Sequence, residues 1–386
     1  EFEVYADKPA AYMLEPPEVV TGENSKRYLK MPEAPEGYRV TCLGADYEQV
    51  IGADGEVYPT IQEKEVEVGF LVERADGTEA EEAREVSFTL RVPAAESLSE
   101  NGKTPGCNPQ PQVIPAIAEW DGGSGDFVPD EDSRIVVQEE ALLQTAELFA
   151  RQYREIMGRE ISILEGTWEE TGPGDFYLGY AADGSSAGNA DSERMETAER
   201  SGEGFCFGDA AKGLGEEGYL CEITDKCVIT GTNQQGIYWG TVTALQILKG
   251  QDGKIPQGRI RDYPKYPVRS FGIDVARKPV SMAMLYRMME TMSWYKMNDF
   301  CIHLNDNVIL STSGLTGSAE EAMTAYSAFR IDSSVINEKG ERLTSSDYAY
   351  TTEEFAAFIE DAKRYGVRVV PEIDTPAHSL SITKLF

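Results

Sequence analysis

The sequence predicts a multidomain protein: an immunoglobulin-like β-sandwich, then an α+β domain, then a segment in which strands and helices alternate. Three observations support this order. Apolar residues alternate strictly with other residues before position 95, which is typical of strands with one buried face. Strand patterns mixed with two helical patterns follow. From about residue 263, apolar strands alternate with helices, as in parallel β/α folds. A chain of 386 residues is long enough for two or three such domains.

The first domain is expected at residues 1–95. Val66, Val68, Phe70 and Val72 lie on one face of a predicted strand, and residues 86–92 repeat the pattern. The stretches "GYRVTCLG" and "GEVYPTI" predict two further strands. A small immunoglobulin-like sandwich fits this spacing, and we see no chemistry in it. Residues 96–112 are polar and rich in Pro and Gly, so they predict a linker.

The second domain is expected at residues 113–262. "SRIVVQE" and "DFYLGYA" predict strands, and "GYLCEITDKCVITG" predicts a hairpin that turns at Asp225 and Lys226. Apolar residues at helical spacing run from 140 to Gly158, a candidate C-cap, and a second helix is expected at 233–250. Strands with two helices laid against them define an α+β domain.

The third segment, residues 263–386, predicts a parallel sheet. "RSFGIDVAR", "DFCIHLNDN" and "VRVVPEI" are the strands, and helices begin at Ser281 and at Thr351 or Thr352, which are N-cap residues. Residues 308–350 form a long insertion. Strands linked through helices favour parallel pairing with right-handed connections.

Composition excludes several classes of protein. The chain carries 67 acidic and 35 basic residues, a net charge of −32, which disfavours binding to nucleic acid or anionic lipid. No apolar run reaches the length of a membrane span. Six cysteines without CxxC spacing argue against a zinc knuckle, and they are too few for a disulfide scaffold.

Polar residues follow each predicted strand of the third segment. They form three groups, Asp274 to Arg277, His303 to Asp306, and Glu372 to His378. Active sites of β/α barrels lie at this end of the strands. Both histidines of the chain are in these groups, which favours a functional site over chance placement.

Two kinds of chemistry fit these residues, and their spacing does not decide between them. In one, His303, Asp306, Asp374 and His378 are nitrogen and oxygen ligands of a metal ion. In the other, a carboxylate holds a histidine in one tautomer for acid–base work. The sequence contains no HExxH, GxSxG or phosphate-binding P-loop motif.

Three motifs in order, "FGIDVARKP", "WYKMNDFCIHLND" and "PEIDTPAHS", resemble the first three β/α units of glycoside hydrolase family 20, the β-N-acetylhexosaminidase family. The preceding domain is similar to the α+β domain found before the barrel in that family. The resemblance covers about residues 113–386. It implies that residues 263–386 are the N-terminal part of a (β/α)8 TIM barrel.

The resemblance also implies roles for individual residues. Arg277 matches an arginine that binds sugar hydroxyls, and Asp306 and His378 match an aspartate and a histidine linked by hydrogen bonds to the catalytic acid. We therefore expect Asp306 and His378 to be catalytic residues that support the acid of the family's Asp-Glu pair. The expected substrate-binding or supporting residues are Arg277, Asp274, Glu372, Asp374 and His303, with Asp274 orienting Arg277 or supporting the barrel rim.

The implied mechanism is retaining and substrate-assisted, and it needs no metal or other cofactor. The 2-acetamido oxygen of the substrate attacks the anomeric carbon, an enzyme carboxylate steadies the acetamido nitrogen, and a glutamate protonates the leaving oxygen. His378 is expected to orient that acid and to keep its pKa raised.

The implied substrates are N-acetylhexosamine glycans of human-milk or mucin type. A secreted or cell-surface bacterial protein is expected, with a signal peptide outside the given chain.

The sequence departs from the family pattern in two places, which concern the catalytic pair and the substrate preference. The Asp-Glu catalytic pair of the family follows the fourth barrel strand, so we expect it beyond Phe386 and expect the chain as given to be an inactive fragment. "HLNDN" replaces a "TDDQ"-like stretch, and with "YSAFR" and "PAHSLSITK" it resembles the lacto-N-biosidase branch, which releases Galβ1-3GlcNAc. Alternatives are an exo-β-N-acetylhexosaminidase, a metal-dependent hydrolase and a non-catalytic glycan-binding protein.

Overall fold

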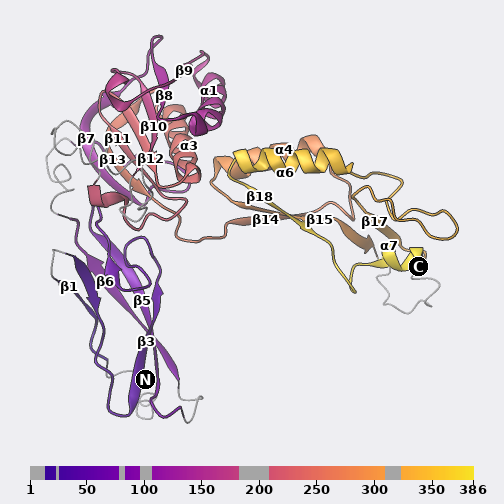
Figure 1. Cartoon of the computed structure of the whole chain (residues 1–386), viewed down its shortest axis with the longest axis horizontal. Coiled ribbons are helices and arrows are strands. Elements are labelled where there is room, and N and C mark those ends of the chain that lie inside the picture. The colour runs from indigo at the N-terminus through magenta and orange to yellow at the C-terminus, as the bar shows by residue number, and fades with distance from the viewer. Residues whose placement is uncertain (1–13, 23–25, 78–82, 96–106, 182–207, 309–322) are drawn as a thin grey trace. The chain divides into compact units, whose positions relative to one another are not determined.

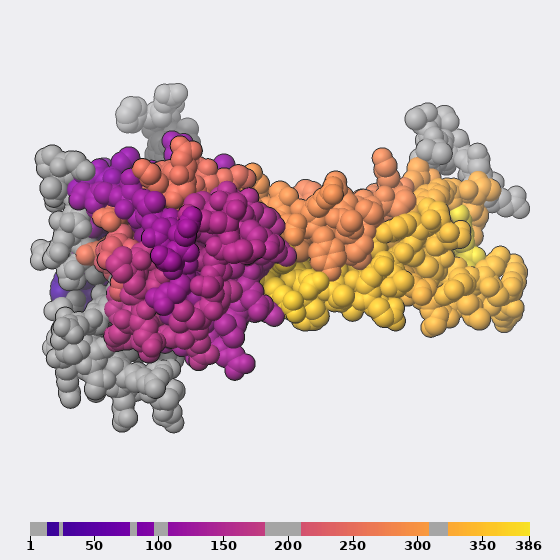
Figure 2. Space-filling view, turned by 90° about the horizontal axis from the view of Figure 1, so that it is seen from above, coloured from indigo at the N-terminus to yellow at the C-terminus, as the bar shows by residue number. Residues whose placement is uncertain are grey.

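The structure is a computed structural model that describes residues 14–22, 26–77, 83–95, 107–181, 208–308 and 323–386. The chain forms two compact units, residues 1–265 and 266–386, drawn in indigo to salmon and in orange to yellow (Figures 1 and 2). The boundary lies close to the predicted one at residue 263. No helix in the described ranges combines the length and the apolar character that crossing a membrane requires.

In the N-terminal part of the first unit, the described residues form six strands in two three-stranded antiparallel sheets. One sheet has the order β1–β2–β4 and the other β3–β5–β6. The strands are β1 (Glu18–Thr21), β2 (Arg27–Lys30), β3 (Tyr38–Ala45), β4 (Glu56–Val57), β5 (Lys64–Arg74) and β6 (Arg84–Val92).

Both sheets contribute to one apolar core. Val66, Val68 and Phe70 of β5 are fully buried, as their alternation predicts, and Leu29 and Val57 of the other sheet belong to the same cluster. Residues of both sheets therefore share one buried cluster. The immunoglobulin-like topology is not confirmed, because the described strands form two sheets of three.

The second domain is built on a mixed seven-stranded sheet with the order β7–β13–β11–β12–β10–β8–β9. Neighbours from β12 to β9 are parallel, and β11, β13 and β7 pair antiparallel. The strands are β7 (Glu119–Phe127), β8 (Arg134–Val137), β9 (Ser162–Glu165), β10 (Phe176–Tyr180), β11 (Tyr219–Ile223), β12 (Cys227–Gly231) and β13 (Ile255–Asp262).

Two helices pack on this sheet, α1 (Leu143–Met157) and α3 (Gln234–Gly250) (Figure 1). Gly158 ends α1 in the left-handed conformation at φ 70°, which an L side chain rarely adopts. The side chain of Asn233 caps α3 by accepting from Gln235 N. The α+β prediction and the hairpin at Asp225 are right, while β7, β9 and β13 were not identified from the sequence.

The predicted linker is only partly a linker. Residues 96–106 lie outside the described residues, but Asn108 is bound to the seven-stranded sheet. Its backbone N donates to Gly123 O at 2.7 Å, and its side-chain amide donates to Gly125 O and Gln257 O. Residues 107–112 therefore belong to the second domain.

The second unit contains a parallel three-stranded sheet with the order β14–β15–β18, and α4 and α6 cover one of its faces (Figure 1). The elements are β14 (Ser270–Asp274), α4 (Met282–Trp294), β15 (Asp299–His303), α6 (Thr352–Arg364) and β18 (Arg368–Glu372). Ser281 and Thr351 cap the two helices, as predicted. This arrangement agrees with the first part of a β/α barrel.

The expected insertion contains regular structure in its described part, residues 308 and 323–350. β16 (Asn305–Val308) pairs antiparallel with β17 (Tyr326–Phe329), and α7 (Leu380–Leu385) lies against both strands. β16 starts two residues after β15 ends. The insertion is therefore attached directly to the polar strand ends.

Candidate active site

The register of the parallel sheet brings three of the predicted residues into one row. Asp274 pairs with His303, and His303 pairs with Glu372, each at the C-terminal end of its strand. Along β15, Phe300 and Ile302 alternate with Cys301 and His303 and are fully buried, and the ring of Phe300 contacts Phe358 of α6. Side chains alternate between the faces of a strand, so the polar row lies on the face opposite α4 and α6.

Asp306 is the centre of the hydrogen-bonded group, and only 1% of its side chain is exposed. Oδ2 lies 2.8 Å from His303 Nε2 and 2.5 Å from the Arg277 guanidinium, and Oδ1 lies 2.8 Å from His378 Nδ1. Asn307 N donates to Oδ1 at 2.6 Å. Burial alone would raise the pKa of this carboxyl, but the hydrogen bonds from Asn307, His303 and His378 and the charge of Arg277 outweigh it and lower the pKa.

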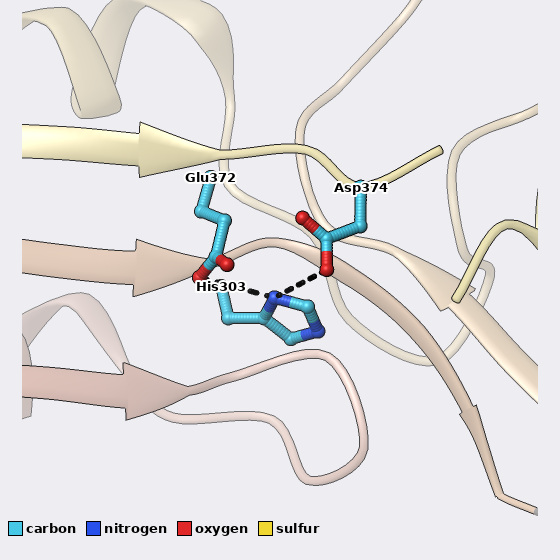
Figure 3. A group of neighbouring side chains, drawn as sticks. All are labelled: His303, Glu372 and Asp374. Atoms are coloured by element: carbon cyan, nitrogen blue, oxygen red, sulfur yellow. Dashed lines mark ion pairs between the residues drawn. The ribbon is translucent and has the colours of Figure 1, made fainter. Parts of the chain in front are cut away.

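His303 lies between Asp306 and two further carboxylates, Glu372 and Asp374. Figure 3 shows His303 with the latter two. Its Nδ1 is 3.2 Å from Glu372 Oε2 and 3.9 Å from Asp374 Oδ2, while Nε2 is bound to Asp306. Burial disfavours the imidazolium, yet the Asp306 hydrogen bond and the surrounding negative charges prevail and raise the pKa of His303. A protonated ring donates from both nitrogens, which suits these neighbours.

Asp274 makes the contacts that orienting Arg277 requires. Its Oδ2 lies 2.6 Å from Arg277 Nη1, and its Oδ1 accepts from the backbone N of Ala276 and of Arg277. The Arg277 guanidinium is therefore tied to two carboxylates, while 43% of the side chain remains exposed. An exposed guanidinium held in this way can donate to a ligand without first being ordered.

Asn305 is a further structural member of the site that the sequence did not single out. It is fully buried, its amide donates to Asp374 O at 3.0 Å and His378 O at 3.1 Å, and its Oδ1 accepts from Asp374 N. His378 has φ 58°, the left-handed region, so its backbone needs such support. The backbone of the Asp374–His378 turn is thus held by Asn305. The sequence signal for Asn305 was its position between His303 and Asp306 in the "HLNDN" motif.

The structure selects a different candidate metal set from the one expected. Ligand atoms of His303, Glu372 and Asp374 all lie within 4.8 Å of one another. Figure 3 shows these three side chains. Asp306 and His378, two of the expected ligands, bind each other instead. Asp306 would hold the ring of His303 for such a metal, as carboxylates behind metal-binding histidines do. A protonated His303 satisfies the same neighbours.

Models of two domains of one family match the chain in succession. The model of glycosyl hydrolase family 20, domain 2, matches residues 110–263, and that of the glycosyl hydrolase family 20 catalytic domain matches residues 266–385. Beta-hexosaminidase 1 of Coccidioides posadasii is 30% identical over 172 residues, which cover 43% of this chain and 26% of that protein. Beta-hexosaminidase of Vibrio vulnificus is 27% identical over 187 residues, 46% of this chain and 21% of that protein.

Solved structures share the fold. The GH20 β-N-acetylhexosaminidase from Streptomyces coelicolor A3(2) superposes with a TM-score of 0.53 at 20% identity, covering 72% of this chain and 49% of that one. Streptomyces plicatus N-acetyl-β-hexosaminidase in complex with Thio-NAglucal gives 0.52 at 21% identity, with 74% and 50% covered. The chain thus spans about half of these structures and less than a third of the two curated relatives.

Proposed function

Because the chain belongs to glycoside hydrolase family 20, we propose that the protein is a retaining, substrate-assisted glycosidase that acts on β-linked N-acetylhexosamine glycans. The observation that carries this proposal is the group around Asp306. One buried carboxylate binds both histidines and the exposed Arg277 at the C-terminal ends of the parallel strands.

In the proposed reaction the residues divide into two roles. Arg277, held by Asp274 and Asp306, donates to hydroxyls of the terminal sugar. His378 keeps Nδ1 on Asp306, which leaves Nε2 for the carboxylic acid that protonates the glycosidic oxygen. The negative charge of Asp306 fixes the tautomer and the orientation of His378, as in other carboxylate–histidine pairs.

The bond changes belong to the substrate-assisted scheme. The acetamido oxygen of the substrate bonds to the anomeric carbon while the glycosidic C–O bond breaks and the leaving oxygen takes a proton. Water then adds to the anomeric carbon and gives a proton to the carboxylate that had protonated the leaving oxygen, while the bond from the anomeric carbon to the acetamido oxygen breaks and the β configuration is retained. His303, Glu372 and Asp374 line the same edge of the sheet, and we assign them to support and substrate contact.

Lacto-N-biosidase activity, the release of Galβ1-3GlcNAc, is the subtype we propose. Its support is the resemblance of "HLNDN", "YSAFR" and "PAHSLSITK" to that branch. An exo-β-N-acetylhexosaminidase is the second candidate, favoured by the names of the curated relatives. We further propose glycans of human-milk or mucin type as substrates and a secreted or cell-surface bacterial location.

The test compares two chromogenic substrates on the purified full-length protein. p-Nitrophenyl lacto-N-bioside and p-nitrophenyl N-acetylglucosaminide are each incubated with and without EDTA. We expect release from the disaccharide alone, unchanged by EDTA. Release from the monosaccharide assigns the exo activity. Activity lost to EDTA supports a metal-dependent hydrolase at His303, Glu372 and Asp374, and glycan affinity without turnover supports a binding protein.

One variant tests the carrying observation directly. Asp306→Asn keeps the size of the side chain but removes the charge that holds Arg277 and both histidines, so kcat/KM is expected to fall by roughly 100-fold, the lower end of acid–base contributions. Asp126→Asn makes the same change at a carboxylate that is 43% exposed in the other unit and is expected to have no effect. An active Asp306→Asn protein would contradict the proposed role.

A further inference from the structure

Arg330 is a buried charged side chain that the proposed reaction does not use. It follows β17 in the insertion, and none of its side chain is exposed. A guanidinium in the interior must place its donors on acceptors, because an unpaired buried charge is costly. Arg330 does so with acceptors from two segments that are far apart in the sequence.

The first segment is the loop that leads from β14 to Arg277. Arg330 Nε donates to Val275 O at 2.9 Å, and Nη2 donates to Ala276 O at 2.8 Å. Both residues are fully buried. These two residues lie between Asp274 and Arg277, so Arg330 binds the backbone directly before the residue whose guanidinium we assign to the sugar.

The second segment belongs to the insertion. Arg330 Nη1 lies 2.7 Å from Asp347 Oδ1 and donates to Tyr348 O at 2.7 Å, while Nη2 donates to Tyr326 Oη. Tyr326 also donates to Asp347 at 2.7 Å. Residues of the insertion therefore orient the Arg330 side chain, and its remaining donors bind the backbone of the loop that precedes Arg277.

We infer that Arg330 is a positioning residue for Arg277 and that it links the insertion to the sugar-binding arginine. This inference rests on the proposed function of Arg277. It predicts that changes in the insertion alter substrate binding through Arg330, without contact between those residues and the sugar. Lysine cannot replace it fully, because one ammonium cannot bind both carbonyls and Asp347 in the planar arrangement of a guanidinium.

A double-mutant cycle tests this coupling in the full-length protein. Arg277→Ala, Arg330→Met and the double variant are compared with the parent for kcat and KM on whichever p-nitrophenyl glycoside it hydrolyses. We expect Arg330→Met to lower kcat/KM by about tenfold in the parent and by less than about twofold in the Arg277→Ala background. Equal losses in both backgrounds would mean a purely structural role and would overturn the inference.

Milder variants guard against a folding defect. Tyr326→Phe removes one acceptor of Arg330 and Asp347→Asn removes the charge of another, while both leave the guanidinium in place. Each is expected to raise KM by about threefold with kcat little changed. Arg342→Lys is the matched control, because Arg342 is exposed, pairs with Asp332 and belongs to the same insertion. An unchanged KM in both milder variants with folded protein contradicts the inference.

A readout without turnover separates this inference from the proposed function. The chain has two histidines, so the ring signals of His303 can be assigned and titrated by NMR in the 386-residue chain. Removing the positive charge with Arg277→Ala is expected to raise the pKa of His303, and Arg330→Met is expected to shift it in the same direction. If Arg277→Ala shifts it and Arg330→Met does not, Arg330 does not position Arg277, whether or not the protein is a glycosidase.

Discussion

At the scale of single residues, the site depends on keeping one carboxylate ionised in a buried place. Asp306 loses hydration on burial, and four donors replace it, two imidazoles, a guanidinium and a backbone N–H. The same contacts favour a charged His303. The two groups therefore stabilise each other's ionised forms, and this mutual effect gives a measurable dependence on pH.

The first prediction concerns that dependence. The pKa of His303 is expected above its ordinary value of 6.5, and Asp306→Asn is expected to lower it, since a hydrogen bond and a charge that raise it are lost. The measurement is an NMR titration, with His378→Gln to assign the signals. A His303 pKa at or below 6.5 in the parent would refute the prediction.

The raised pKa of His303 makes the free energy of unfolding depend on pH. The folded state binds the His303 proton more tightly than the unfolded state does, so this contribution is fully present below the unfolded pKa. It is lost as pH rises through the higher folded value. The parent is therefore expected to lose stability relative to His303→Gln over that range, as urea unfolding at several pH values can show.

At the scale of elements, capping residues fix where the helices between the site-bearing strands begin. Thr351 accepts from Glu354 N while the Glu354 side chain accepts from Thr351 N, a capping box at the start of α6. The helix ends in the basic residues Lys363 and Arg364, and β18, which carries Glu372, begins at Arg368. Local signals in the sequence thus set where the third strand begins.

The second prediction tests this cap. Thr351→Ala removes the acceptor for Glu354 N and is expected to lower the free energy of unfolding by about 1 kcal/mol. Thr352→Ala, one residue further on and outside the capping box, is the control and is expected to have a much smaller effect. Chemical unfolding of the second unit, followed by circular dichroism, measures both; equal effects would show that the capping box contributes nothing.

At the scale of the whole molecule, a buried ion pair joins the N-terminal sheets to the seven-stranded sheet within the first unit. Arg261 Nη1 lies 2.7 Å from Glu119 Oε1, and neither side chain is exposed. Glu119 Oε2 accepts from Ile61 N, and Arg261 Nη2 donates to Gln49 O. Both partners thus lie on the second domain and bind the first, which makes the N-terminal β-domain part of one compact unit.

The third prediction follows from the burial of this pair. Glu119→Gln leaves the Arg261 charge buried without its counter-ion, and the first unit is expected to lose about 3–5 kcal/mol of stability. Glu65→Gln breaks an exposed pair with Arg91 and is expected to cost less than about 1 kcal/mol. Urea unfolding followed by tryptophan fluorescence compares the two; similar midpoints would argue against a structural role for the buried pair.

The sequence by itself determined the order of a β-rich segment, an α+β domain and a β/α segment, the strands β14, β15 and β18 with helices α4 and α6, and the polar residues at the strand ends, because periodicity, caps and strand-end residues are local signals. The immunoglobulin-like topology and the elements β16, β17 and α7 were not determined by it. It missed β7, whose Gly-rich "EWDGGSGDF" lacks alternation and forms a strand only beside β13. Only tertiary structure decided that Asp306 rather than Asp374 binds His378, that His303 faces Glu372, and that Asn305 and Arg330 hold the site. Those contacts join residues about 55 to 73 positions apart, and sheet register and burial bring them together, which no local pattern encodes.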